Sequence, residues 1–197
     1  HDVMEVASPE GWQRNRNLVL DFYNQRRKQL KTVVPNAAHH ALVRLEEKFD
    51  VTIITQNVDD LHERAGSANI IHLHGELRKV RSTVYPNLIY EWEEDCVEGD
   101  TCEKGAQLRP HIVWFGEAVP EIERAAALMP IVERVIIVGT SMQVYPAAGL
   151  IHYAQGFVPI HYVDPRPAAI DWTGPLEIIP EPATQGLDAL VQRLLDA

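Results

Sequence analysis

The chain alternates between short apolar runs and longer amphipathic stretches. The apolar runs are rich in Val and Ile and are bounded by polar residues, a pattern typical of buried strands. These runs cover residues 51–54, 70–74, 111–115, 135–138 and 159–163. Apolar residues spaced three and four apart predict helices at 8–30, 35–49, 60–65, 120–128, 146–155 and 187–195. This order predicts an α/β fold in which helices cover a parallel sheet on both faces.

Residues 81–108 break this alternation, with clustered charges and few apolar periods. We expect an irregular excursion there, so that about 78–108 would form a small inserted module. The 197 residues otherwise fit one domain, 1–197. Apolar residues make up 46% of the chain, enough for a core, and no run is long or apolar enough to cross a bilayer.

The formal net charge of -10 argues against nucleic acid as a partner, because an acidic surface repels phosphates. The same charge would tolerate or attract lysine-rich protein segments. The two cysteines, Cys96 and Cys102, are too few for a disulfide framework and fit a reducing compartment. We therefore expect a cytoplasmic monomer without a membrane partner.

Small and polar residues follow three of the predicted strands. Residues 55–59 follow the first strand, residues 139–141 follow the run at 135–138, and Asp164 follows the run at 159–163. Ligands of open parallel sheets bind beyond the carboxyl ends of the strands, so these segments are candidates for a ligand site. The alternative is that they are ordinary strand-to-helix turns, which use the same residue types.

Four motifs in the chain resemble those of the sirtuin family. They are the segments at 55–59 (TQNVD), 72–76 (HLHGE), 113–117 (VWFGE), and 139–141 (GTS) with 144–148 (VYPAA). One such motif would be weak, whereas four in the family's order and spacing are specific and cover essentially the whole chain. The resemblance implies a Rossmann-like sheet and an NAD-dependent deacylase, with NAD as co-substrate and the acylated lysine of a protein as substrate.

The resemblance implies that His74, which precedes Gly75, is the general base. In the family mechanism the acyl oxygen attacks the ribose carbon that bears nicotinamide, and the base then takes a proton from a ribose hydroxyl. The products are free lysine, nicotinamide and O-acyl-ADP-ribose. Histidine suits this step because its pKa lies near neutral pH. The alternative is a histidine with a structural hydrogen bond, and His72 is the nearest rival for the catalytic role.

The resemblance also implies which residues contact NAD. Those expected near the nicotinamide and its ribose are Gln56, Asn57, Val58 and Asp59. Those expected near the adenosine and the phosphates are Gly139, Thr140, Ser141, Asp164, Pro165, Arg166 and Ala183. Asp164 stands where the family usually has asparagine. The alternative for Asp59 or Asp60 is that it caps the helix that follows.

The motif at 113–117 resembles the strand that pairs with the backbone of the substrate peptide. The substrate contacts it implies are Val113, Phe115, Gly116 and Glu117, with Val144. The alternative is a plain core strand, and alternate residues must pack inward in either case.

Tyr23 and Arg26 lie three residues apart on the first predicted helix, and they resemble the pair of the desuccinylase branch of the family. A guanidinium can bind the carboxylate of a succinyl or malonyl group in a bidentate manner, with help from a phenol hydroxyl. Taken alone, the run Arg26, Arg27 and Lys28 would instead be a solvated basic helix face.

Two features depart from the family. The chain starts at His1 without the family's glycine-rich turn, so we expect a fragment or a shortened form that lacks the N-terminal βα unit and binds NAD poorly. Many sirtuins hold zinc with four cysteines, whereas Cys96 and Cys102 alone make a poor zinc site. Two other activities stay open, a peptide-binding module without catalysis and mono-ADP-ribosyl transfer.

Overall fold

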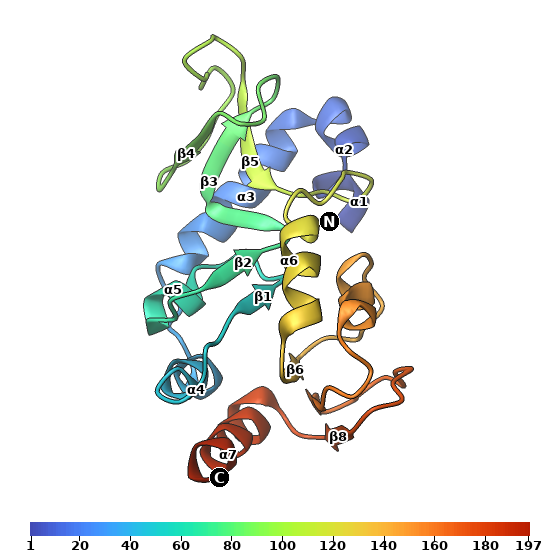
Figure 1. The fold of residues 1–197 in the computed structure, drawn as a ribbon. Coiled ribbons are helices and arrows are strands. Elements are labelled where there is room, and N and C mark those ends of the chain that lie inside the picture. Colours follow the sequence, from blue (N-terminus) through green and yellow to red (C-terminus); the bar gives the residue numbers. More distant parts are fainter. The chain divides into compact units, whose positions relative to one another are not determined.

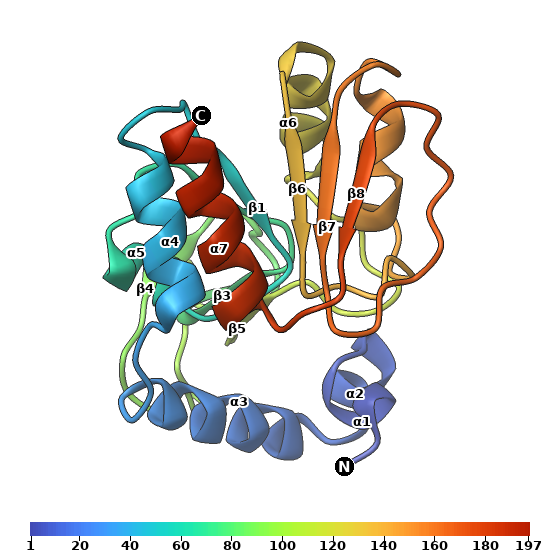
Figure 2. The ribbon, with the colours of Figure 1, turned by 90° about the horizontal axis from the view of Figure 1, so that it is seen from below.

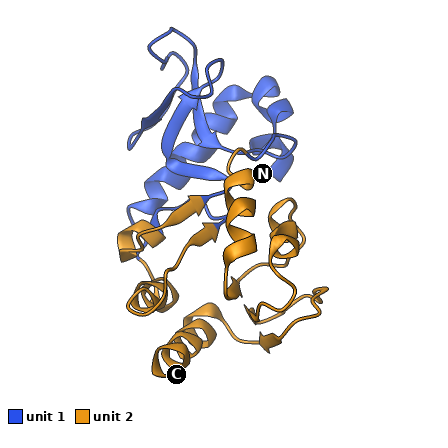
Figure 3. Cartoon of the chain, in the orientation of Figure 1, with its two compact units in different colours: residues 1–34, 55–61, 72–119 blue, residues 35–54, 62–71, 120–197 orange.

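The computed structural model describes all residues, 1–197. The chain forms two compact units whose segments interleave along the sequence (Figure 3). Unit 1 contains residues 1–34, 55–61 and 72–119, and unit 2 contains residues 35–54, 62–71 and 120–197.

Unit 1 begins with three helices, α1 (Val3–Val6), α2 (Pro9–Arg14) and α3 (Arg16–Leu30) (Figure 1). The Ser8 side chain caps α2 by accepting a hydrogen bond from the Gly11 amide, as the predicted helix start requires. The single helix predicted for residues 8–30 is wrong, because Asn15 leaves the helical conformation and caps α3 through the Leu18 amide. An asparagine side chain competes with the backbone in this way, so it favours a break over a continuous helix.

The same unit contains a three-stranded antiparallel sheet of β3 (Gly75–Ser82), β4 (Ile89–Glu91) and β5 (Leu108–Ile112), with β3 in the centre. The irregular structure predicted for residues 81–108 is therefore wrong in three places. β3 ends inside this range at Ser82, β4 lies within it, and β5 begins at its last residue, Leu108. The predicted strand at 111–115 also ends earlier, at Ile112, since residues 115–116 form a turn in which Gly116 has a φ of 88°.

The core of unit 1 lies between α2, α3 and the antiparallel sheet. Its buried side chains are Trp12, Val19, Leu20, Tyr23, Leu30, Leu77, Val80, Cys96, Cys102, Leu108, Ile112 and Trp114. Four aromatic rings at or near this core, Trp12, Trp114, Phe22 and Tyr23, stack in two pairs. This packing fixes the positions of Tyr23 and of Trp114.

Two short strands, β1 (Ile53–Thr55) and β2 (Ile70–His72), pair with each other, and α5 (Leu61–Ala65) lies between them in the sequence. The predicted strand at 70–74 ends at His72, because Leu73 and His74 form the turn into β3. At the end of α5, Gly66 has a φ of 110°, the left-handed conformation that favours glycine at a helix C-terminus.

Unit 2 contains a parallel sheet of β6 (Val135–Val138), β7 (Ile160–Val163) and β8 (Leu176–Ile179), in that order (Figure 2). Its helical elements are α4 (Ala37–Leu45), α6 (Ile122–Leu128), α7 (Ala183–Asp196) and the 3-10 segments η1 (Met129–Ile131) and η2 (Ala147–Tyr153). Side chains of successive strand residues point to opposite faces. Val138 and Val163 pack against α4 and α7, whereas Ile137 and Tyr162 pack with Ile151 of η2. The predicted parallel sheet with helices on both faces is confirmed for the runs at 135–138 and 159–163. The run at 111–115 instead contributes to the antiparallel sheet, and the runs at 51–54 and 70–74 form a separate two-stranded sheet.

No helix combines the length and the apolar character that crossing a membrane would require.

Candidate functional site

His74 lies in the turn between β2 and β3, where its backbone carbonyl accepts a hydrogen bond from the Val113 amide at 2.9 Å. Burial lowers the pKa of His74, and a hydrogen bond to the Gln56 backbone opposes this shift. The imidazole is therefore neutral near pH 7, the form that can take a proton. Gly75 has a φ of 87°, and a Cβ there would lie 2.0 Å from the His111 carbonyl oxygen, so only glycine lets β3 begin directly after His74.

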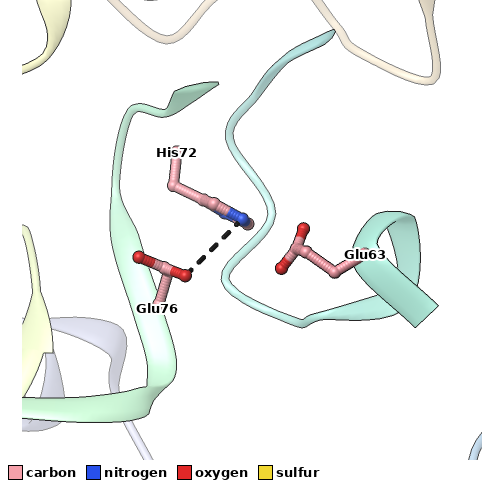
Figure 4. A group of neighbouring side chains, drawn as sticks. All are labelled: Glu63, His72 and Glu76. Atoms are coloured by element: carbon pink, nitrogen blue, oxygen red, sulfur yellow. Dashed lines mark ion pairs between the residues drawn. The ribbon is translucent and has the colours of Figure 1, made fainter. Parts of the chain in front are cut away.

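His72, the rival histidine, has partners that tie it to the backbone around it. Its Nδ1 lies 3.2 Å from the Asn57 carbonyl oxygen, and its Nε2 lies 3.8 Å from a carboxylate oxygen of Glu76 (Figure 4). The side chain is only 9% exposed. These contacts give His72 a structural part in holding the 55–59 segment beside β2.

The segment at 55–59 follows β1, as predicted. The hydroxyl of buried Thr55 accepts a hydrogen bond from the Asn57 amide at 3.0 Å, and the Asn57 residue is exposed. Val58 packs against the core of unit 1. Asp59 accepts a hydrogen bond from the Leu61 amide at 3.0 Å through one carboxylate oxygen at the start of α5, and this contact is compatible with the expected contact to NAD.

In unit 2 the expected nucleotide contacts lie at the carboxyl ends of the parallel strands. Gly139 follows β6 with a φ of 61°, and exposed Ser141 follows it. The Thr140 carbonyl accepts a hydrogen bond from the Tyr162 hydroxyl at 2.7 Å, which fixes this turn to β7. Hydroxyl groups, a glycine turn and a carboxylate at the ends of parallel strands fit the ribose and phosphates of a nucleotide.

The segment after β7 carries the second set of expected nucleotide contacts. Asp164 uses one carboxylate oxygen to accept a hydrogen bond from the Arg166 amide at 2.7 Å. Pro165 and Arg166 are exposed. Ala183 is the first residue of α7, directly after the loop that follows β8. All of these residues therefore lie where the predicted fold class binds its ligands.

The expected peptide-binding segment follows the end of β5. Phe115 is 52% exposed, while its amide donates to the Ala7 carbonyl at 3.0 Å, so the ring faces solvent from an anchored backbone. Gly116 is exposed, and Val113 is half-buried. Val144, in unit 2, is 39% exposed. Exposed apolar side chains on a fixed backbone suit the binding of an extended peptide.

Tyr23 and Arg26 differ in their surroundings although they lie one helical turn apart on α3. Tyr23 is 4% exposed, whereas Arg26 is exposed and its guanidinium lies 4.7 Å from the centre of the Phe22 ring. Burial raises the pKa of Tyr23, against the effects of a hydrogen bond from Trp114 and of the nearby Arg109 and Arg26 charges. The phenol therefore stays protonated and can donate a hydrogen bond.

A charged cluster that the sequence did not reveal lies beside Tyr23. Glu117 accepts hydrogen bonds from Arg109 at 2.9 Å and from Arg81 at 3.0 Å, and both arginine side chains are only 12% exposed. Burial lowers the pKa of Arg109 to about 10, and the Arg81 charge adds to this effect. Two guanidiniums share one carboxylate, so the cluster carries one positive charge in excess.

The contacts between Arg109, Trp114 and Tyr23 were also missed. The Arg109 guanidinium lies 3.5 Å from the centre of the Trp114 ring, and the indole nitrogen donates to the Tyr23 hydroxyl at 3.2 Å. The one signal in the sequence was the place of Trp114 inside the motif at 113–117. The structure buries that tryptophan, which is 2% exposed.

The two cysteines do not form a zinc site with the residues around them. Burial raises the pKa of Cys96 to about 11, so its thiol stays protonated at neutral pH, and the Cys102 thiol forms a hydrogen bond with Ser82. Neither cysteine has two further His, Cys, Asp or Glu side chains close enough to complete a metal site. A structural zinc site needs four ligands, so these residues do not fit zinc.

Comparison with known proteins gives consistent matches. The Sir2 family model matches residues 1–146. An NAD-dependent protein deacylase of Helicobacter pylori (strain J99) is 53% identical over 196 residues, which cover 100% of this chain and 84% of that protein. The crystal structure of a Sir2 homolog–NAD complex matches with a TM-score of 0.85 and 35% identity, over 98% of this chain and 77% of that chain. A structure of Sir2 bound to acetylated peptide matches with a TM-score of 0.78 and 25% identity, over 98% and 82% of the two chains.

The parallel sheet of unit 2, with helices on both faces and polar residues after two of its strands, defines an α/β fold of the kind that binds nucleotides. The family model covers most of the chain and a relative matches its whole length, so the chain belongs to the Sir2 family of NAD-dependent protein deacylases. The family identified from the sequence motifs is therefore confirmed.

Proposed function

We propose that this enzyme removes succinyl and malonyl groups, as well as acetyl groups, from the lysine side chains of proteins. The observation that carries the acidic acyl preference is the positive charge around the Tyr23 hydroxyl. Arg26 lies one turn from Tyr23 on α3, and Arg109 stacks on Trp114, whose indole nitrogen donates to the Tyr23 hydroxyl, in a chain whose formal net charge is -10. An acyl group that ends in a carboxylate gains from this charge, whereas a neutral acetyl group does not.

His74 acts as the general base. NAD, when bound, supplies the ribose carbon that the acyl oxygen attacks as nicotinamide leaves, and the ribose hydroxyl that receives the acyl group. His74 takes the proton of that hydroxyl, and its neutral imidazole and its hydrogen bond to the Gln56 backbone support this role. One water molecule from solvent is consumed as the amine leaves, so the products are free lysine, nicotinamide and O-acyl-ADP-ribose.

The residues that hold NAD fall into two sets. Gln56, Asn57, Val58 and Asp59 bind the nicotinamide and its ribose. Gly139, Thr140, Ser141, Asp164, Pro165, Arg166 and Ala183 bind the adenosine and phosphate part. The exposed, polar ends of β6 and β7 support the second set, because hydroxyls and carboxylates there can pair with ribose hydroxyls.

The substrate peptide pairs with the backbone at Val113, Phe115, Gly116 and Glu117, with Val144 as a further contact. The exposure of the Phe115 ring supports this proposal, since an apolar side chain open to solvent can cover a bound peptide. Backbone pairing gives affinity with little preference for the peptide sequence, so the acyl group decides selectivity.

Replacement of Arg26 tests the acyl preference. Arg26→Met removes the exposed guanidinium and keeps an unbranched side chain of similar length. We expect kcat/KM for succinyl- and malonyl-lysine peptides to fall about tenfold to a hundredfold, the worth of a charge-assisted hydrogen bond, and kcat/KM for the acetyl peptide to change much less. Lys28→Met is the matched control, because Lys28 is an exposed cation on the same helix that pairs with Asp95.

Mass spectrometry of peptide and cofactor distinguishes the other outcomes. Free lysine with O-acyl-ADP-ribose supports the proposed reaction. Equal losses with all three acyl peptides, or an intact succinyl reaction in Arg26→Met, would show that Arg26 does not read the acyl group. ADP-ribose attached to protein would identify mono-ADP-ribosyl transfer instead, and peptide binding without any product would identify a binding module.

A further inference from the structure

The Tyr23 hydroxyl accepts a hydrogen bond from Trp114, and its own proton stays available for donation to a ligand. The indole nitrogen of Trp114 donates to it at 3.2 Å, and the two residues are 4% and 2% exposed. An indole N–H can only donate, so the hydroxyl oxygen must be the acceptor in this bond. The Tyr23 hydroxyl donates no hydrogen bond to another group of the protein, so its proton is available to a ligand.

Two neighbouring groups contact the Trp114 ring. The Arg109 guanidinium stacks 3.5 Å from the ring centre, and the Trp12 ring lies 5.7 Å away. Arg109 is itself fixed, because it donates to Glu117 at 2.9 Å and to the Ile112 carbonyl at 2.9 Å. The direction of the indole N–H is therefore set by packing and by a charged cluster.

We propose that Trp114, clamped by Arg109, is a positioning residue that makes Tyr23 a hydrogen-bond donor to the carboxylate of the acidic acyl group. This inference rests on the proposed function, in which Tyr23 and Arg26 read that carboxylate. The indole N–H occupies a lone pair of the hydroxyl oxygen, so the hydroxyl proton points away from the indole and toward an anion. An anion there also meets Arg26, one turn away on α3, and the single excess positive charge of the cluster of Arg81, Arg109 and Glu117.

A contact that only stabilises the fold would have a different signature. Loss of a structural contact lowers the amount of folded enzyme and affects every acyl substrate equally. Loss of a positioning contact weakens the binding of the acidic acyl groups and spares the acetyl group, which has no carboxylate. The ratio of kcat/KM for succinyl over acetyl peptides therefore separates the two roles, because the amount of active enzyme cancels in it.

The test uses Trp114→Phe, which keeps an aromatic ring and removes the N–H. We expect the succinyl-to-acetyl ratio to fall about tenfold through a higher KM for the succinyl peptide, as the loss of one well-oriented hydrogen bond would give. Trp172→Phe is the matched control, because it removes another indole N–H, which donates to the Val158 carbonyl at 3.0 Å and contacts neither Tyr23 nor Trp114. Its ratio should equal that of the unmodified enzyme.

A double-mutant cycle with Tyr23→Phe supplies the second measurement. If Trp114 acts through the Tyr23 hydroxyl, Trp114→Phe should not lower the ratio further once that hydroxyl has been removed. Independent, multiplying losses would overturn the inference, and so would an unchanged ratio in Trp114→Phe. Because Phe is smaller, the benzothienylalanine analogue at position 114 repeats the test with the indole shape kept and sulfur in place of the N–H.

The same data separate this inference from the proposed function. If Arg26→Met and Tyr23→Phe both keep the full succinyl-to-acetyl ratio, the proposed acyl reading is wrong. If Arg26→Met and Tyr23→Phe lower the ratio and neither Trp114 variant does, the proposed preference for acidic acyl groups is supported. Only the positioning role of Trp114 is then overturned.

Discussion

At the scale of single residues, His111 of β5 shows how the charged cluster affects stability. Its Nδ1 lies 3.4 Å from an Arg81 nitrogen, and Lys79, Arg109 and Glu76 are the other charges that act on it. Burial first, and the Arg81 charge second, lower the pKa of His111 to about 4. The native protein therefore keeps this imidazole neutral at pH values where an unfolded histidine is already protonated.

This shift predicts a loss of stability in mild acid. The folded pKa is lower than the unfolded value of about 6.5, so the unfolded chain binds more protons as the pH falls below about 6.5. The contribution of His111 is complete above that pH and decreases toward pH 4, by about 2 kcal/mol between pH 7.5 and pH 5. Urea unfolding of the protein and of His111→Gln at both pH values measures it. The variant should lose that much less stability on acidification, and equal losses would contradict the assigned cause.

The residue scale also shows what the sequence could predict about the site. The motif around Gly75 favours His74 over His72 as the general base, and this assignment stays a prediction. The structure adds that His72 contacts the Asn57 carbonyl and Glu76, and that burial lowers the pKa of His74. The roles of Arg109 and Trp114 could not be predicted. They depend on contacts with Glu117 and Tyr23 that form only when β5 and α3 pack together.

At the scale of elements, α7 packs closely against the parallel sheet through Gly186. A Cβ at this position would lie 2.8 Å from a methyl carbon of Val163 and 3.0 Å from one of Ile179. Both neighbours are β-branched strand residues; Val163 is fully buried in the core of unit 2 and Ile179 is half-buried against it, so they have little freedom to move aside. Glycine is therefore favoured here although it is a poor helix former.

We predict that Gly186→Ala destabilises the protein. Alanine gains up to about 1 kcal/mol in helix propensity, but overpacking of a core costs about 1–3 kcal/mol, so the expected net loss is about 1 kcal/mol. Denaturant unfolding measures the change. Ala189→Gly, at an exposed position of the same helix, calibrates the propensity difference without the packing change. A Gly186→Ala protein more stable than the parent would show that the sheet can yield at this point.

The surroundings of each strand decided whether its sequence pattern could predict it. Val135–Val138 lies in a parallel sheet covered by helices on both faces, so its apolar run identified it in full. β3 was missed because its buried residues alternate with Glu76, Arg78 and Arg81, and such charged residues are typical of loops. β8 was missed because its side chains alternate between exposed and half-buried, and Glu177 interrupts its apolar pattern.

At the scale of the whole molecule, the α/β class was predictable from the alternation of strands and helices, but the division into units was not. Unit 1 takes three separate stretches of the chain, and unit 2 takes the intervening ones. Such an arrangement depends on which distant segments share a core. A hydrophobic pattern indicates which face of each element is buried, but it does not indicate which distant elements pack against that face.

The net charge of the whole chain leads to a prediction about substrates. At -10, the molecule attracts positively charged peptides over distances that salt can screen. We expect an acyl-lysine peptide with lysine-rich flanks to have a KM several-fold lower at about 20 mM salt than the same peptide with glutamate-rich flanks. The advantage should shrink at about 300 mM salt, where the Debye length is about 6 Å.

The charge of the flanks affects the association of peptide and enzyme and does not affect the reaction of the acyl group, so kcat should be the same for both peptides. Glycine–serine flanks provide the uncharged control, and equal salt dependence for all three peptides would show that only contacts within the acyl site govern binding.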